Sequence, residues 1–192
     1  AYGITPQRAW DSFFPVGGET PATDRAVTIR QLYDIVFYIA VVIFFLVEAL
    51  IVWSVIRYRR KPGDDELPPQ THGNNLVEVI WTAIPVVIVG FLFVLSFQAL
   101  NTVEASTDAE VRIRAFAARY QWEFDYLDAD GNVLFTQALP TGDAGGMVVP
   151  VDEPVHVTLR SDDVIHAFYV PRFLFKRDVI PGVENNFDFT VE

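Results

Sequence analysis

The chain has 192 residues, a formal net charge of −11 and 51% hydrophobic residues. Chains this acidic are seldom so apolar, so the composition predicts two regions of different character. The absence of cysteine excludes a disulfide framework, a thiolate metal site and a cysteine nucleophile within this sequence. The first residue is Ala1 rather than Met, which favours a processed chain that has lost a signal peptide.

The first 100 residues contain two long apolar runs, and the first of them follows a mixed lead-in. Residues 1–31 are mixed and contain several prolines and glycines, so we expect an irregular, external lead-in. The run from Leu32 to Ile56 is apolar apart from Asp34 and Glu48. A membrane-spanning helix needs about 20 mostly apolar residues, and this run is long enough.

A second apolar run, Leu76 to Leu100, follows a loop at residues 57–75. The loop begins with the basic sequence RYRRK, and its prolines prevent the first helix from continuing. We predict a transmembrane helical hairpin over residues 32–100, with the loop in the cytoplasm by the positive-inside rule. A pair of soluble core helices is disfavoured, because a small domain could not bury two such runs.

Three carboxylates lie in these helices, and each must face a partner, a cavity or the membrane interface. Asp34 is near the outer end and is expected at the interface. Glu48 is the most deeply placed, and we expect a hydrogen bond to another membrane subunit. Glu78 begins the second helix on the cytoplasmic side. It could stabilise the positive helix N-terminus or take up protons from the cytoplasm, and the residues alone leave both readings open.

Residues 101–192 have the texture of a β domain, with short alternating runs between turn signals such as the Asp-Gly of LDADGNV. We predict an antiparallel Greek-key β-sandwich or barrel on the external side. Sixteen acidic residues against seven arginines and lysines give this region a charge of −9. Such a field favours a cationic partner and argues against nucleic acid.

The chain has three histidines and one methionine. His72 lies in the loop and is expected to be solvated. His156 alternates with the apolar residues of VHVTLRS, so we expect a solvated surface ring. His166 is either a core ring or one ligand of a metal. His156, His166 and Met147 could form a thiolate-free copper site only if the fold brought them together, and their spacing gives no sign of that.

Trp122 lies in the aromatic stretch QWEFDY and is either a core residue or a ring at a docking surface. Two further motifs are VEVIWTAIP, residues 77–85, and DDVIHAFYVP followed by KRDVIPG. With these three motifs in this order, nearly the whole chain resembles subunit II of a bacterial haem-copper oxidase of the cytochrome c oxidase type. The resemblance implies a two-helix membrane hairpin followed by a cupredoxin-like domain at residues 101–192.

The resemblance also implies roles at matching positions. His166 resembles the first histidine ligand of the family's dinuclear copper centre, copper A. Trp122 resembles the tryptophan through which electrons arrive from docked cytochrome c. Glu78 resembles the carboxylate at the cytoplasmic mouth of a proton pathway into subunit I, which holds the haems and the oxygen chemistry. The implied setting is a bacterial plasma membrane, with subunit I, other membrane subunits, cytochrome c and the lipid bilayer as partners.

The sequence also departs from the family pattern. Glu123 and Phe124 stand where Tyr-Trp is usual, and Val183 stands where Arg is usual, which puts a contact towards the haem propionates in doubt. The family continues past FDFTVE into a segment that carries the other copper ligands. We therefore expect a copper site that is incomplete here, because this sequence is part of a longer chain; a second possibility is that another chain supplies the missing ligands. The alternatives for function are a copper-free quinol oxidase subunit and a membrane-anchored β domain that only binds a partner.

Overall fold

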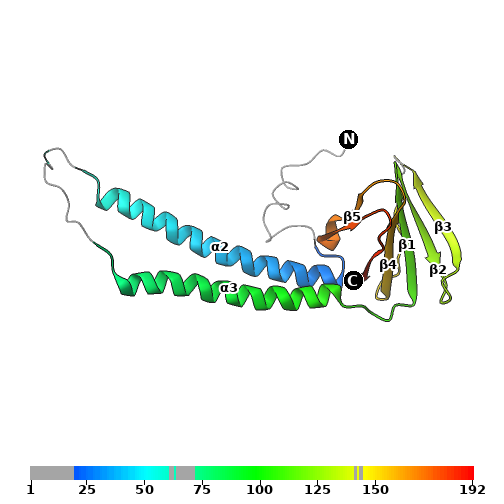
Figure 1. Ribbon diagram of the computed structural model, residues 1–192, viewed down its shortest axis with the longest axis horizontal. Coiled ribbons are helices and arrows are strands. Elements are labelled where there is room, and N and C mark those ends of the chain that lie inside the picture. The colour runs from blue at the N-terminus through cyan, green and yellow to red at the C-terminus, as the bar shows by residue number, and fades with distance from the viewer. Residues whose placement is uncertain (1–19, 61–62, 64–71, 141, 143–144) are drawn as a thin grey trace. The chain divides into compact units, whose positions relative to one another are not determined.

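A computed structural model describes residues 20–60, 63, 72–140, 142 and 145–192. Within these residues two long α-helices precede seven β-strands (Figure 1). The helices are α2 (Asp24–Arg57) and α3 (Asn75–Glu104). The strands are β1 (Val111–Ala118), β2 (Gln121–Leu127), β3 (Val133–Pro140), β4 (Pro154–Ser161), β5 (His166–Val170), β6 (Phe175–Val179) and β7 (Asn185–Thr190), with a 3-10 helix, η1 (Pro171–Phe173), between β5 and β6.

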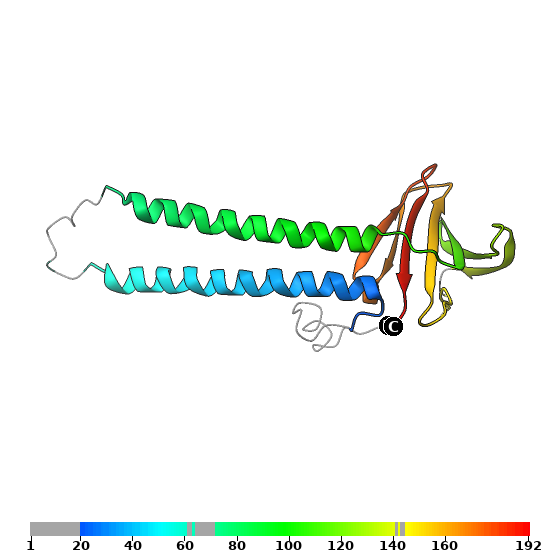
Figure 2. The same cartoon turned by 90° about the horizontal axis from the view of Figure 1, so that it is seen from below.

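The chain divides into two compact units. One unit, Tyr33–Phe97, contains most of the two helices, which run antiparallel in both views (Figures 1 and 2). The other unit combines Ala1–Leu32 with Gln98–Glu192, so the first turns of α2 and the last turns of α3 belong with the strands.

Both helices are long and apolar enough to cross a membrane, by length and composition. Their most apolar stretches bury none of their residues within the described structure. The only buried residues of the helices are Arg25, Ala26 and Ala99, which lie in the ends that belong with the strands. A core helix of a soluble protein would bury one face, so these exposed apolar surfaces require another apolar environment.

Helix α2 begins at Asp24, within the stretch that the sequence predicted to be irregular. The expectation was wrong for residues 24–31, and residues 1–19 lie outside the described part. The buried Thr23 caps the helix, because its hydroxyl accepts a hydrogen bond from the Ala26 amide at 3.1 Å. The Asp24 carboxylate accepts from the Thr190 amide at 3.0 Å and so ties the helix to β7.

The strands form two sheets, as a β-sandwich requires. The five-stranded sheet has the order β3-β2-β1-β4-β7, and β5 and β6 form the second sheet. The predicted β-sandwich is confirmed, and one pairing departs from the antiparallel arrangement, because β1 and β4 run parallel. The chain leaves β1 into the β2–β3 hairpin and returns on the other side of β1 as β4, in the same direction as β1.

The core lies between the two sheets and follows the predicted alternation. In β1 and β4 every second residue is buried, and the intervening polar side chains face outwards. The buried set includes members from both sheets, namely Ile113, Ala115, Ala117, Phe124, Tyr126, Val155, Val157, Leu159, Phe168, Phe173, Val179, Phe187 and Phe189.

Candidate functional site

Trp122 and His166 come from different sheets and meet at one edge of the sandwich. Trp122 lies in β2 and His166 begins β5. Their ring centroids are 6.4 Å apart with an interplanar angle of 65°, an edge-on contact. Trp122 also contacts Phe168 edge-on at 5.8 Å and stacks parallel to Phe124 at 6.4 Å. The tryptophan is therefore half-buried, with one part in the core and another part beside the histidine.

The His166 ring is oriented by a carboxylate in the loop before β5. Its Nε2 lies 2.7 Å from Asp163 Oδ1. The Val164 amide and the Ser161 hydroxyl donate to the same oxygen, at 2.6 Å and 3.0 Å. The other carboxylate oxygen accepts from the Arg119 amide at 2.8 Å. The hydrogen bond from His166, followed by that from the Val164 amide, holds the pKa of Asp163 well below its usual range.

The loop before β5 fixes one nitrogen of the His166 ring. Among the described residues no group bonds to Nδ1 of His166. Metal-binding histidines commonly bond a carboxylate through one nitrogen and the metal through the other. The arrangement around His166 is therefore suited to one metal-ligand position.

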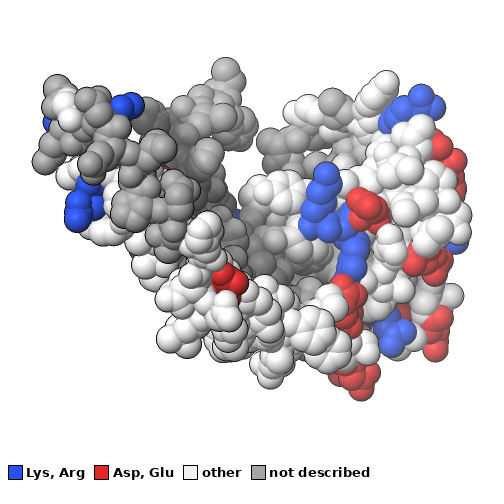
Figure 3. Space-filling view, turned by 60° about the vertical axis from the view of Figure 1, so that its left-hand side comes forward, with Lys and Arg blue, Asp and Glu red and all other residues white. Residues whose placement is uncertain are grey.

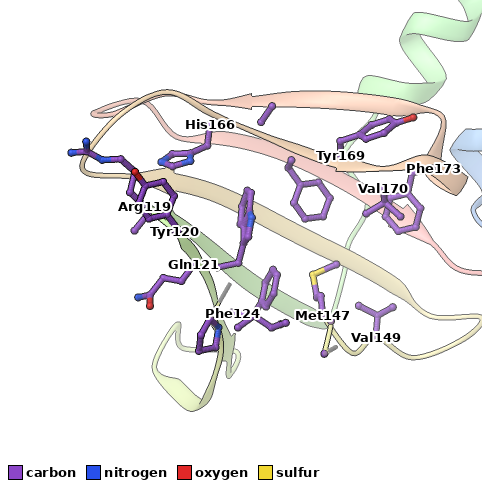
Figure 4. A pocket seen from close by; sticks show the side chains of 18 of the residues that line it. Arg119, Tyr120, Gln121, Phe124, Met147, Val149, His166, Tyr169, Val170 and Phe173 are labelled. Carbon is purple, nitrogen blue, oxygen red and sulfur yellow. The ribbon is translucent and has the colours of Figure 1, made fainter. Parts of the chain in front are cut away.

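A cavity of about 730 Å³ is lined by residues of β2, the end of β3 and β5 (Figure 4). Its walls are largely apolar and aromatic, and they include Trp122, Phe124, Phe168 and Phe173. His166 and Met147 both line the cavity, and Met147 lies on the opposite side of it, between Phe124 and Val149 (Figure 4). The segment that carries Met147 is held in place because the Tyr126 hydroxyl bonds both the amide and the carbonyl of Val148, at 2.8 Å and 2.9 Å.

His156 does not belong to this cavity, so the three candidate copper ligands are not brought together. Nor is it the freely solvated ring that the sequence predicted. Its Nδ1 lies 2.5 Å from Oδ1 of Asp188, which is 4% exposed. The other oxygen of Asp188 accepts hydrogen bonds from the amide and the hydroxyl of Thr107. The alternation of β7 places Asp188 on the outer face, but the sequence did not reveal the β4–β7 register that aligns it with His156.

Asp188 is a buried carboxylate that stays ionised. Burial by itself raises its pKa, but the hydrogen bonds from Thr107 and His156 outweigh burial, so the pKa lies below the usual value. Thr107 lies in the segment between α3 and β1, and Asp188 lies in β7. Through these bonds Asp188 connects β7 to β4 and to the segment before β1, which are distant in the chain.

Glu78 lies in the first turn of α3, in the other compact unit. Asn74 caps this helix by accepting from the amides of Leu76 and Val77, at 3.0 Å and 3.2 Å. Gly73 has φ +105°, and a Cβ at that position would lie 2.8 Å from a carboxylate oxygen of Glu78. The loop before the helix thus leaves room for the exposed carboxylate.

Charged side chains are scattered among other residues, and acidic and basic groups are interspersed on the face shown in Figure 3. Several are paired on the surface, including Arg114 with Asp125 at 3.7 Å and Arg160 with Glu184 at 3.1 Å. The domain's net charge of −9 is therefore not concentrated in one patch on this face.

Two family models match the chain. Residues 10–99 match the transmembrane domain of cytochrome c oxidase subunit II, and residues 111–192 match its periplasmic domain. A probable cytochrome c oxidase subunit 2 from Streptomyces avermitilis is 30% identical, over 92% of this chain and 67% of its own length. Cytochrome c oxidase subunit 2 from Alkalihalophilus pseudofirmus is 35% identical, over 84% of this chain and 43% of its own length.

Among solved structures, the periplasmic domain of cytochrome oxidase subunit II from Bradyrhizobium japonicum is 29% identical, with a TM-score of 0.39. The match covers 45% of this chain and 67% of that one.

Two apolar helices followed by a two-sheet sandwich define a membrane protein with an external cupredoxin-like domain. The chain belongs to the family of cytochrome c oxidase subunit II. It spans from 43% to 67% of the length of the two curated relatives described above.

The described residues fit one ligand position of a copper centre and do not complete the centre. His166 has the orientation of a ligand, but no group of three or more His, Cys, Asp or Glu side chains among the described residues could hold a metal ion. The sequence has no cysteine to supply a thiolate. Other ligands are therefore needed before His166 can hold copper.

Proposed function

We propose that this chain is the electron-accepting subunit of a bacterial terminal oxidase. In this role it takes electrons from cytochrome c and delivers them to the haems of subunit I, where oxygen is reduced. The observation that carries the proposal is the contact between Trp122 and His166, with ring centroids 6.4 Å apart. The two residues belong to motifs that are well separated in the sequence, and each resembles a residue of the same electron route.

His166 would be one ligand of a dinuclear copper centre, whose remaining ligands are not among the described residues. Such a centre supplies one-electron chemistry when it is bound. The chain's own contribution is to orient the His166 ring through Asp163 and to surround it with aromatic side chains. A largely apolar surrounding limits the access of water to a redox site.

Trp122→Phe tests the proposed electron route. Phenylalanine preserves an aromatic ring but removes the larger indole, so the rate of electron uptake from reduced cytochrome c should fall by about tenfold or more. Stopped-flow oxidation of reduced cytochrome c by the complete oxidase measures that rate. Trp53→Phe is the matched control, because Trp53 is an exposed residue of α2 outside the β domain.

The two variants should bind the same amount of copper and assemble equally well. An unchanged rate in Trp122→Phe would contradict the role of this residue. Rapid oxidation of a quinol together with no oxidation of cytochrome c by the wild type would favour a quinol oxidase.

We further propose that Glu78 lies at the cytoplasmic mouth of a proton pathway. The carboxylate is exposed at the start of α3, and the loop at Gly73 leaves space beside it. Glu78→Gln removes the titratable group at almost constant size. Steady-state oxygen consumption should fall, while the first electron transfer from cytochrome c keeps its rate.

The control for Glu78→Gln is Glu110→Gln, which removes an exposed carboxylate just before β1. Both measurements use the oxidase in proteoliposomes, with a pH-sensitive dye to follow proton uptake. Equal turnover of the two variants would remove Glu78 from the pathway.

The proposed partners are the lipid bilayer, subunit I, other membrane subunits and cytochrome c. We place the hairpin, residues 32–100, in the bacterial plasma membrane with loop 57–75 in the cytoplasm, and residues 101–192 on the external side, where they meet cytochrome c. The side chain of Glu48 is exposed in α2 and has no hydrogen bond or ion pair among the described residues. An ionisable group within a membrane span needs a partner, which favours a contact with subunit I or another membrane subunit.

A further inference from the structure

A second cavity, of about 410 Å³, lies at the outer face of the five-stranded sheet near the start of β1 and β4. Arg112 and His156 are direct partners in the parallel β1–β4 register. Thr158 lies two residues further along β4 and shares the face of His156. Ser106 and Thr107, from the segment between α3 and β1, complete the polar part of the wall.

No acidic residue lines this cavity, although acidic residues outnumber arginines and lysines by sixteen to seven in this region of the chain. The remaining lining residues are apolar or glycine. Asp108 and Glu110 are close in sequence, but they are exposed and are not part of the wall. A cavity that excludes carboxylates in such an acidic domain is suited to a negatively charged ligand.

Arg112 differs from the other arginines of the β domain. Among the described residues Arg114, Arg119, Arg160 and Arg177 each form an ion pair with a carboxylate, and Arg172 donates to the backbone and hydroxyl of Thr20. The side chain of Arg112 has no hydrogen bond or ion pair among those residues. Its guanidinium group therefore keeps its donors available at the cavity.

His156, which forms part of this wall, is held in place by a carboxylate. Asp188 bonds its Nδ1, is buried, and does not line the cavity, so the carboxylate lies behind the ring. No described group bonds to Nε2. In the protonated ring Nε2 is a donor, and together with Arg112 and the hydroxyl of Thr158 it can contact several oxygens of one tetrahedral anion.

We propose that this cavity binds a phosphate group. An arginine, an imidazole and the hydroxyls of Ser106 and Thr158 are typical partners of phosphate oxygens, while the hydroxyl of Thr107 already donates to Asp188. The cavity is open and larger than one phosphate requires, so the group can be free phosphate or the headgroup of a phospholipid. The site is separate from the cavity of Trp122 and His166, and its occupancy does not depend on copper or on electron transfer.

The test uses the complete oxidase and two probes, inorganic phosphate and phospholipid. Calorimetric titration with inorganic phosphate, in detergent without phospholipid, should give saturable binding. In Arg112→Gln the affinity should fall by about tenfold or more, because a charged donor is lost. Arg160→Gln is the matched control, since Arg160 lies on the same face of β4 but is paired with Glu184 and does not line the cavity.

The second arm distinguishes the two sources of phosphate. The oxidase is placed in nanodiscs of phosphatidylcholine with a minor fraction of phosphatidylglycerol, and native mass spectrometry counts the phosphatidylglycerol molecules that are retained. One fewer in Arg112→Gln than in Arg160→Gln would identify a lipid headgroup. Saturable phosphate binding without that difference would identify free phosphate.

The proposal is overturned if inorganic phosphate does not bind and the two variants retain the same number of phosphatidylglycerol molecules. It is also overturned if Arg112→Gln and Arg160→Gln lower phosphate affinity equally. Arg112 is exposed and unpaired, so its replacement should leave the fold intact, and circular dichroism of both variants checks this point.

Discussion

The β domain contains two histidine–aspartate pairs that differ in what they connect. His166, at the start of β5, meets Asp163 three residues earlier at 2.7 Å, whereas His156 meets Asp188 across β4 and β7 at 2.5 Å. The Asp163 side chain remains 24% exposed, and that of Asp188 is 3% exposed. The first pair orients a ring beside a cavity. The second pair joins distant segments. A histidine–aspartate pair therefore contributes mainly to the candidate site at His166 and mainly to the stability of the fold at His156.

Asp188→Asn should have the largest effect on stability. The amide has one acceptor oxygen in place of two, so donors from Thr107 or His156 lose their partner in a buried position. We expect the free energy of unfolding to fall by about 2–3 kcal/mol. Thermal unfolding of the purified subunit measures the change, with the exposed Asp108→Asn as the control. An unchanged melting temperature would show that the pair does not hold the three segments together.

Asp163→Asn should have the opposite profile, with little effect on the melting temperature and a clear effect on copper. The pair with His166 orients the ring, and loss of such a partner lowers metal affinity by about 10- to 100-fold. Copper titration of the metal-depleted oxidase, followed by absorption spectroscopy, gives the affinity. Asp162→Asn is the control, because Asp162 is the exposed neighbour. Equal copper affinity in both variants would contradict the role of Asp163.

The smallest expected effect is on the pH dependence of stability, which should differ between the wild type and Asp188→Asn. The pKa of Asp188 lies below its usual value of 3.8. A carboxylate with a lowered pKa in the folded state stabilises the protein above its unfolded pKa, and this contribution is lost as the pH falls through the folded value. From about pH 5 to about pH 2 the wild type should therefore lose more stability than Asp188→Asn. Parallel stability curves for the two proteins would show that Asp188 titrates normally.

Much of the fold could be predicted from the sequence because it depends on local pattern. The apolar runs beginning at Leu32 and Leu76 indicated two membrane helices, and alternation in the later runs indicated a sandwich. The pattern could not give the start of α2 at Asp24. That start depends on the Thr23 cap and on the bond between Asp24 and Thr190, far away in the chain. Nor could it give the parallel β1–β4 pairing, because the pattern within a strand does not show which other strand it pairs with.

The candidate site was predictable in its members and not in its arrangement. Trp122 and His166 each stood out as residues within an aromatic motif. Their edge-on contact follows from the packing of two sheets. The sequence placed His156 on the polar face of its strand but did not reveal its acidic partner, because that partner lies on a strand whose register no local pattern reveals.

The sequence by itself determined that this chain has two membrane-spanning helices and an external β domain, because hydrophobic length and alternation are properties of neighbouring residues. It also displayed the motifs of the cytochrome c oxidase subunit II family. Only the tertiary structure decided that Trp122 meets His166, that Asp188 fixes His156, and that Arg112 faces a cavity without carboxylates. These contacts join residues from different strands, and their distances are set by sheet pairing and core packing.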